Sequence, residues 1–87
     1  MKTFDLEIVT PESRVFSGPV KSVKVPGSMG SFQVLVNHAP IISTLGEGKV
    51  KIVKENGDTL EYHTKDGVIE VLKNKTIILV EQLLEDE

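Results

Sequence analysis

The chain has 87 residues, no cysteine and a formal net charge of −3. A chain of this length fits one small domain, and without cysteine no disulfide is available to stabilise it. Valine, isoleucine and threonine are abundant, whereas Ala39 is the only alanine. Because β-branched residues favour strands and alanine favours helices, this composition excludes a helical bundle or a coiled coil and predicts an all-β domain.

The charges are unevenly distributed. Residues 81–87 carry four acids and no base, a charge of −4, which leaves +1 for residues 1–80. Neither part has the clustered lysine and arginine of a nucleic-acid-binding surface, so no nucleic-acid partner is expected. The first residues, Met1–Asp5, contain no apolar segment, and a secretory signal is not expected either.

Alternation of apolar and polar residues predicts a series of short strands. In chain order the expected strands span residues 4–10, 15–17, 20–25, 32–36, 41–45, 49–53, 60–64, 68–72 and 76–80. Turn residues recur every eight to twelve positions, which is the pattern of a sandwich or barrel. We therefore predict a two-sheet β-sandwich of about nine or ten short strands.

Two dipeptides that end in glycine, and the last seven residues of the chain, complete the expected organisation. Asn56-Gly57 is a strong hairpin signal, and Asp66-Gly67 is expected to form a second turn of the same kind. Residues 81–87 are the only helical candidate, but seven residues are too few for a stable isolated helix, so a short terminal turn is expected. The predicted organisation is a β-sandwich domain at residues 1–80 followed by a short acidic tail at residues 81–87.

The longest uncharged stretch lies between Lys24 and Glu47. It covers 22 residues in a chain of which 26% are charged, and two prolines and three glycines interrupt it, which argues against a membrane span. One interpretation is a buried central hairpin. A second, compatible interpretation is a hairpin whose loops also face a partner, because the centres of protein interfaces are depleted in charge.

No arrangement of catalytic or metal-binding residues is evident. Gly46–Lys49 resembles a phosphate loop, but its glycine spacing is too short and Val50 stands where serine or threonine is required. His38 and His63 lie 25 positions apart with no third ligand at a recognisable spacing. We expect His63 to face solvent and His38 to be hydrogen-bonded within a turn. The sequence thus predicts a binding or structural module with no catalytic site, metal or cofactor.

Several motifs, spread over nearly the whole chain, resemble one known family. They are Leu6–Glu12, Val15–Gly18, Val25–Phe32 followed by Asn37–Pro40, and Asp66–Val71 with Asn74. On these motifs the sequence resembles the N-terminal β-sandwich domain of the epsilon subunit of the F-type ATP synthase.

The resemblance implies a non-catalytic rotor subunit of the central stalk in a proton-translocating ATP synthase. Such a subunit links the gamma subunit to the membrane c ring and couples rotation to ATP synthesis. Contact with the catalytic alpha and beta subunits, and with the membrane, is implied only through the assembled complex. The implied location is peripheral, on the cytoplasmic face of a bacterial inner membrane.

The resemblance also assigns residues to the c ring. Those implied to face the ring lie in two loops: Ser28, Met29, Gly30, Ser31, Phe32, His38, Ala39 and Pro40. For Phe32 an alternative is a place wholly within the core, because it shares a strand face with Val34 and Val36. The residues that face the gamma subunit are left open.

Two features depart from the family pattern. Gln33 stands where the family often has glycine. The chain also ends at Glu87, whereas the usual family member continues into a pair of C-terminal helices that can restrain ATP hydrolysis. We expect this chain to lack that form of inhibition.

Two other classes of protein compete with the stalk interpretation. A biotinyl or lipoyl carrier domain is also small and all-β, and it presents a modifiable lysine at a hairpin tip. Lys54 and Lys65 flank predicted turns, but neither stands in the Met-Lys-Met or Asp-Lys-Ala context of such domains. The second alternative is a generic β-sandwich interaction module.

Overall fold

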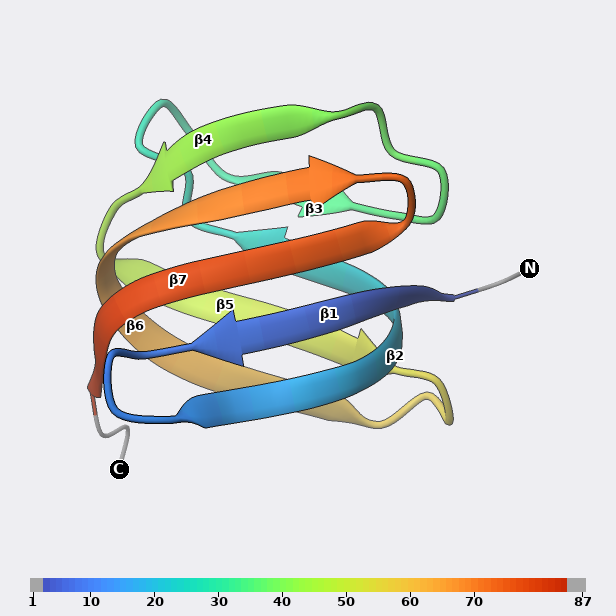
Figure 1. Ribbon diagram of the computed structural model, residues 1–87, viewed down its shortest axis with the longest axis horizontal. Coiled ribbons are helices and arrows are strands. Elements are labelled where there is room, and N and C mark those ends of the chain that lie inside the picture. Colours follow the sequence, from blue (N-terminus) through green and yellow to red (C-terminus); the bar gives the residue numbers. More distant parts are fainter. Residues whose placement is uncertain (1–2, 85–87) are drawn as a thin grey trace.

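The computed structural model describes residues 3–84, and in that range the chain forms seven β-strands and no helix (Figure 1). The strands are β1 (Phe4–Val9), β2 (Arg14–Val25), β3 (Phe32–Val34), β4 (Ile41–Leu45), β5 (Gly48–Lys54), β6 (Thr59–Leu72) and β7 (Lys75–Leu84). The all-β prediction is confirmed, although the strands are fewer and longer than the sequence pattern indicates.

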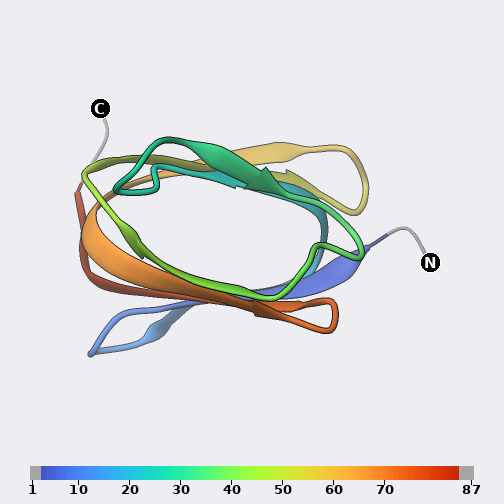
Figure 2. The same cartoon turned by 90° about the horizontal axis from the view of Figure 1, so that it is seen from above.

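Backbone pairing closes the strands into a flattened ring. The order is β1–β7–β6–β5–β2, and β2 pairs again with β1. All neighbours are antiparallel except β1 and β7, which are parallel. Seen from above, the ring has two facing layers (Figure 2). Layer A contains β4, the second half of β6, β7, β1 and the first half of β2; layer B contains β3, the second half of β2, β5 and the first half of β6. The predicted sandwich is thus confirmed.

Two strands serve both layers. Strand β2 pairs with β1 through residues 14–20 and with β5 through residues 20–24. Strand β6 pairs with β5 through residues 59–64 and with β4 through residues 67–71. Because each of these strands has two parts, seven strands supply nine segments. The sequence pattern detects the segments but not the continuity of the backbone between them.

The Asp66-Gly67 pair is a bend inside β6, so the turn predicted there is wrong. Asp66 has a φ of 56°, yet the pairing register with β7 is the same before and after it. A Cβ atom at Gly67 would lie 2.5 Å from the carbonyl oxygen of Leu79 and 2.8 Å from Cγ1 of Val80. The glycine therefore lets β6 approach β7 closely at the point where β6 passes between the layers.

Strand β7 runs beyond the expected end of the domain at residue 80. Residues 82–84 pair with residues 63–65 of β6. The terminal turn predicted for this segment is therefore wrong for residues 81–84, and residues 85–87 lie outside the described range. Pairing with β6 satisfies backbone groups that a single isolated helical turn would leave without partners. An acidic tail as a separate unit stays a prediction.

The core lies between the two layers and receives apolar side chains from every strand. Its buried members are Phe4, Leu6, Ile8, Val20, Val23, Val25, Val34, Leu45, Val50, Ile52, Ile69, Val71, Ile78 and Val80. Most are β-branched and recur at every second position, because successive side chains of a strand point to opposite faces. This periodicity is the reason that the sequence predicts the strands well.

Two threonines are polar exceptions within the core. Thr64 and Thr76 are fully buried, and among the described residues their Oγ1 atoms have no hydrogen-bond partner. A buried hydroxyl without a partner costs about 1–3 kcal/mol. We expect Thr76→Val, which replaces the hydroxyl by a methyl group, to raise the free energy of unfolding by about 1 kcal/mol.

Urea denaturation of the purified chain measures this change. The matched control is Thr59→Val, because Thr59 is exposed on β6 and its hydroxyl is solvated. An equal gain at both positions would assign the effect to strand propensity, and the proposed cost of the buried hydroxyl would be wrong.

Candidate functional site

The uncharged stretch of the sequence forms the open edge of the sandwich. Strand β3 lies at the edge of layer B and β4 at the edge of layer A, and their backbone partners are β2 and β6 respectively. They do not pair with each other, so the interpretation as a buried central hairpin is wrong. Residues 26–31, residues 35–40 and β4 are together called the rim below. Strand β4 runs along the upper edge in Figure 1, with one loop at each end.

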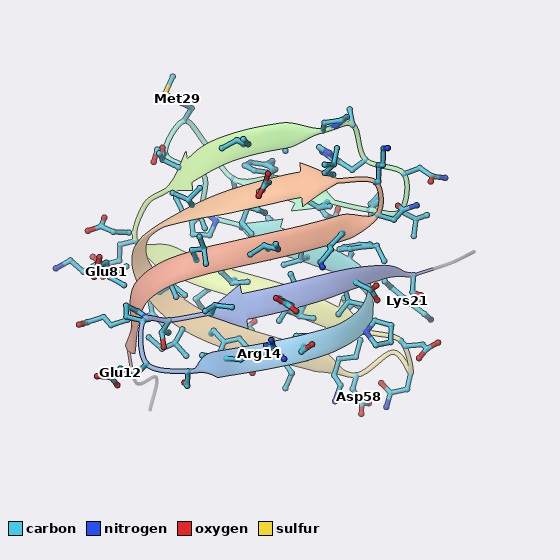
Figure 3. All side chains as sticks on the ribbon, in the orientation of Figure 1. Glu12, Arg14, Lys21, Met29, Asp58 and Glu81 are labelled. Carbon is cyan, nitrogen blue, oxygen red and sulfur yellow. The ribbon has the colours of Figure 1, made fainter. Side chains whose placement is uncertain are left out.

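The first loop of the rim carries Met29 at its tip. The Met29 side chain is 99% exposed and points away from the sandwich (Figure 3). The N–H of Gly30 donates to the carbonyl of Gly27 at 3.0 Å, which closes a tight turn. Gly30 has a φ of 131°, and a Cβ atom at Gly27 would lie 2.6 Å from the Gly30 carbonyl oxygen. Both positions of this turn therefore require glycine.

Ser28 anchors this loop to β4. Its N–H donates to the carbonyl of Thr44 at 3.0 Å, and the Thr44 hydroxyl donates to Ser28 Oγ at 2.8 Å. The N–H of Gly46 donates to the carbonyl of Pro26 at 2.8 Å. These three hydrogen bonds hold the loop against the end of β4, so the backbone on either side of Met29 is fixed in position.

Phe32 differs from Met29 in its surroundings. It is half-buried and packs against the core, with its ring lying over the backbone of Gly27. Phe32 is therefore not wholly within the core, and its assignment to the c ring stays a prediction. The exposed members of this loop are Ser28, Met29, Gly30 and Ser31.

The second loop of the rim joins β3 to β4. Ala39 and Pro40 are exposed, and His38 is half-buried. The backbone N–H of His38 donates to the carbonyl of Leu35 at 3.1 Å, and its Nδ1 lies 2.6 Å from the carbonyl oxygen of Ala39. Because a carbonyl oxygen only accepts, Nδ1 carries the proton in this contact. The prediction that His38 is hydrogen-bonded within a turn is confirmed.

The two predicted loops lie at opposite ends of β4. Gly27 bridges to Leu45 at one end of the strand, and Pro40 precedes Ile41 at the other. A strand of this length separates them by roughly 13 Å. The predicted residues are therefore brought onto one rim, but they do not form a single compact cluster.

The outer faces of the two layers differ in chemistry, and sequence reasoning missed this difference. Layer A exposes, wholly or partly, the apolar side chains of Val9, Ile42, Val68, Leu72, Ile77 and Leu79. Leu79 pairs with Val9 on one side and with Val68 on the other, so these three lie side by side. The six residues are called the apolar face below; the exposed Glu70 lies on the same face, paired with Ile42 on one side and with Ile77 on the other.

The outer face of layer B is charged. Its strands expose Lys24, Lys51 and Glu61 in one cross-strand row, with Lys49 and His63 in the next. Lys49 Nζ lies 3.7 Å from Glu61 Oε1. His63 is partly exposed, as predicted. The sequence does contain a signal for this difference between the outer faces. Residues 76–80 are apolar at four of five positions, whereas apolar residues alternate with lysine in residues 49–53.

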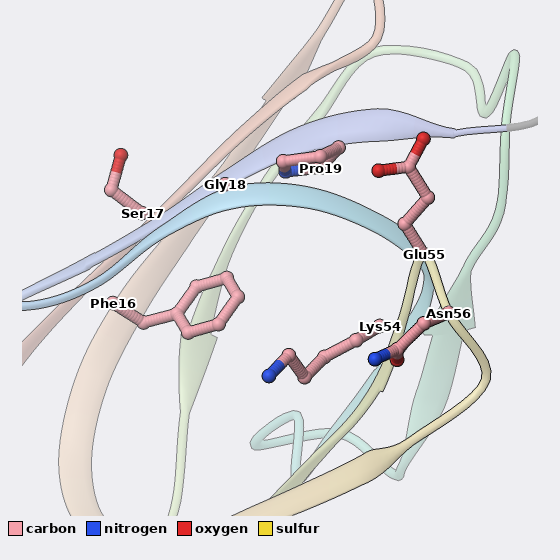
Figure 4. Close-up of a pocket in the computed structure, with 7 residues that line it drawn as sticks. All are labelled: Phe16, Ser17, Gly18, Pro19, Lys54, Glu55 and Asn56. Carbon is pink, nitrogen blue, oxygen red and sulfur yellow. The ribbon is translucent and has the colours of Figure 1, made fainter.

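A surface hollow of about 340 Å³ lies apart from the rim (Figure 4). It is lined by Phe16, Ser17, Gly18, Pro19, Lys54, Glu55 and Asn56, none of which is a predicted site residue. Within residues 3–84, no group of three or more histidine, aspartate or glutamate side chains is placed to hold a metal ion. The same range contains no helix long and apolar enough to cross a membrane.

Relatives of known identity resemble this chain over most of its length. An ATP synthase epsilon chain of Chlorobaculum tepidum is 42% identical over 94% of this chain and 93% of that protein. The ATP synthase epsilon chain of Chlorobium limicola is 40% identical over the same shares. That of Dichelobacter nodosus is 37% identical over 91% of this chain but only 55% of its own length.

Solved structures share the fold. A chain in the mitochondrial ATP synthase of Euglena gracilis matches with a TM-score of 0.90 at 17% identity, over 97% of this chain and 54% of that one. A chain of the central stalk and c ring of Tetrahymena thermophila matches with a TM-score of 0.76 at 17% identity, over 93% of this chain and 65% of that one. Residues 3–86 match the family model for the β-sandwich domain of the ATP synthase delta/epsilon chain, and the chain belongs to this family.

Proposed function

We propose that this chain is an epsilon-type subunit of the central stalk of an F-type ATP synthase. It has no catalytic site of its own, links the gamma subunit to the c ring, and couples rotation to ATP synthesis. The observation that carries the proposal is the 42% identity to an ATP synthase epsilon chain over 93% of that protein's length. The proposed location is the cytoplasmic face of a bacterial inner membrane, where partner subunits hold the chain.

We assign the rim to the c ring. Its two loops present Ser28, Met29, Gly30 and Ser31 at one end of β4, and His38, Ala39 and Pro40 at the other. Two properties support the assignment. The whole rim is uncharged, as the centres of protein interfaces usually are. The tip of its first loop also carries the exposed Met29, and a methionine side chain adapts its shape to a partner.

We assign the apolar face of layer A to the gamma subunit. Ile42 is 72% exposed and Leu79 is 51% exposed. Val9, Leu79 and Val68 are contiguous on this face, and a contiguous apolar patch on a soluble domain marks an interaction surface. The outer face of layer B is the weaker candidate, because lysine is depleted at interfaces. The two assigned surfaces meet at β4 and share Ile42, while their other residues are distinct, so one domain can contact both partners at once.

The carrier-domain alternative is not favoured. Lys54 is the last residue of β5 and Lys65 lies within β6, so neither occupies a hairpin tip. Lys73 does lie in the turn between β6 and β7, but it is flanked by Leu72 and Asn74. That is not the sequence context of a biotinylated or lipoylated lysine.

The proposal is tested by charge substitutions on the two outer faces. Leu79→Glu places a charge on the apolar face, where it would be desolvated without a partner at the gamma interface. We expect the affinity for the purified gamma subunit to fall by about a hundredfold or more, because such a charge costs several kcal/mol. Binding is measured by titration calorimetry.

The matched control is Lys51→Glu, which adds the same side chain to an exposed strand position of layer B. We expect little change in its affinity for the gamma subunit. If Lys51→Glu abolished binding and Leu79→Glu did not, the gamma assignment would be reversed. If the unmodified chain bound neither the gamma subunit nor the c ring, the stalk function itself would be wrong.

A further inference from the structure

Two asparagines far apart in the sequence form a reciprocal pair. The N–H of Asn37 donates to Oδ1 of Asn74 at 2.7 Å, and Nδ2 of Asn74 donates to Oδ1 of Asn37 at 3.1 Å. Asn37 belongs to the second loop of the rim, and Asn74 belongs to the turn between β6 and β7. The pair therefore connects the rim to the body of the sandwich.

The backbone around Asn74 joins a third segment to this pair. The carbonyl of Asn74 accepts a hydrogen bond from the N–H of Asp5 at 3.0 Å, at the start of β1. Asn74 has a φ of 61° and Asn37 a φ of 67°. Asparagine tolerates this left-handed conformation better than any residue except glycine, and unlike glycine it supplies both a donor and an acceptor.

Two kinds of contact anchor the second loop of the rim: Val36 packs against the core, and the asparagine pair supplies the hydrogen bonds. Among the described residues, every hydrogen bond that joins residues 37–40 to a part of the chain outside their own loop goes to Asn74. The first loop has an equivalent anchorage in the bonds between Ser28 and Thr44. Hydrogen bonds thus hold the rim at both ends of β4, through Ser28 and Thr44 at one end and through the two asparagines at the other.

We propose that Asn74 is a positioning residue for the c-ring contact: its side-chain amide holds the loop at residues 37–40 in one conformation. A loop that is already ordered loses less conformational entropy when a partner binds, so the anchored loop binds more tightly than a free one. This inference rests on the proposed function, and it adds a residue outside the two loops of the rim to those that determine attachment to the c ring.

The first test uses the isolated chain and does not depend on any partner. Asn74→Gly keeps the backbone free to adopt a φ near 61° but removes the amide. We expect the amide proton of Asn37 to exchange with solvent about tenfold faster or more, as measured by nuclear magnetic resonance, because the Asn37 N–H loses its hydrogen-bond acceptor. Asn74→Asp retains an acceptor for this N–H and is expected to restore most of the protection.

The matched control is Lys73→Gly. Lys73 is the other residue of the same turn, with a φ of 50° and an exposed side chain. We expect it to leave the exchange rate of the Asn37 amide unchanged. An unchanged rate in Asn74→Gly, or an equal increase in Lys73→Gly, would overturn the inference.

The second test measures binding of the full chain to a detergent-solubilised c ring. We expect Asn74→Gly to weaken ring binding about tenfold while affinity for the gamma subunit stays unchanged, and Asn74→Asp to recover part of the loss. If Met29→Asp weakens ring binding but Asn74→Gly does not, this inference fails and the proposed function stands. If the unmodified chain does not bind the ring, both fail.

Discussion

Replacing Gly67 by alanine is expected to lower the free energy of unfolding by about 2–3 kcal/mol, the upper part of the range for an overpacked site. The new Cβ would lie 2.5 Å from the Leu79 carbonyl oxygen and 2.8 Å from Val80 Cγ1. The first contact is with backbone, which cannot rotate away, so β6 and β7 must separate locally. A domain of this size has a total stability of roughly 4–13 kcal/mol, and the loss is a large part of it.

The matched control for this variant is Gly46→Ala. At Gly46 an added Cβ would meet only the Pro26 carbonyl oxygen, at 4.0 Å, which is an ordinary contact. Urea denaturation of both variants, compared with the unmodified chain, separates the close approach from the general effect of losing a glycine. Equal changes at the two positions would show that the bend in β6 does not require glycine.

Met29→Asp is expected to have the largest functional effect of any single change on the rim. The side chain is 99% exposed at a turn tip, so the isolated domain tolerates a charge there and its stability changes little. At a desolvated interface an unpaired carboxylate costs several kcal/mol, and affinity for the c ring should fall by about a hundredfold or more.

In enzyme reconstituted into vesicles, proton pumping per ATP hydrolysed should fall, while the gamma subunit stays bound. Thr59→Asp adds the same charge at an exposed position away from the rim and serves as the control. Unchanged pumping per ATP in the Met29→Asp enzyme would show that this loop is not the ring contact.

The local parts of the fold could be predicted from the sequence, because strands leave a period-two signature that does not depend on what they pair with. The buried face of β5, with Val50 and Ile52 inside and lysines outside, is an example. The continuity of β6 through Asp66-Gly67 could not be predicted in this way. A dipeptide that favours a hairpin turn is held in a strand by pairing with β7, and that pairing is non-local.

The same distinction between local signals and non-local pairing applies to the candidate site. The exposure of Met29 and the turn around His38 follow from local glycine and proline placement, and both were predictable. Phe32 was ambiguous, because alternation places it on the core face whether or not its ring is covered. The apolar face of layer A was missed, since which strands adjoin one another decides whether Leu79 and Val68 form a patch.

The position of β1 has a consequence for how the chain folds. One neighbour of β1 is β2, which follows it directly, and the other is β7, where Asp5 pairs with Lys75 near the opposite end of the chain. The hairpin of β1 and β2 can form early from local contacts. The closed sheet, however, is complete only when β7 pairs with β1 and β6. Until then β1 and β6 each present an unpaired edge, which is a template for aggregation. Folding should therefore be slow for a domain of this size, in the range of milliseconds to seconds, and a chain that ended before β7 would be expected to aggregate rather than to fold.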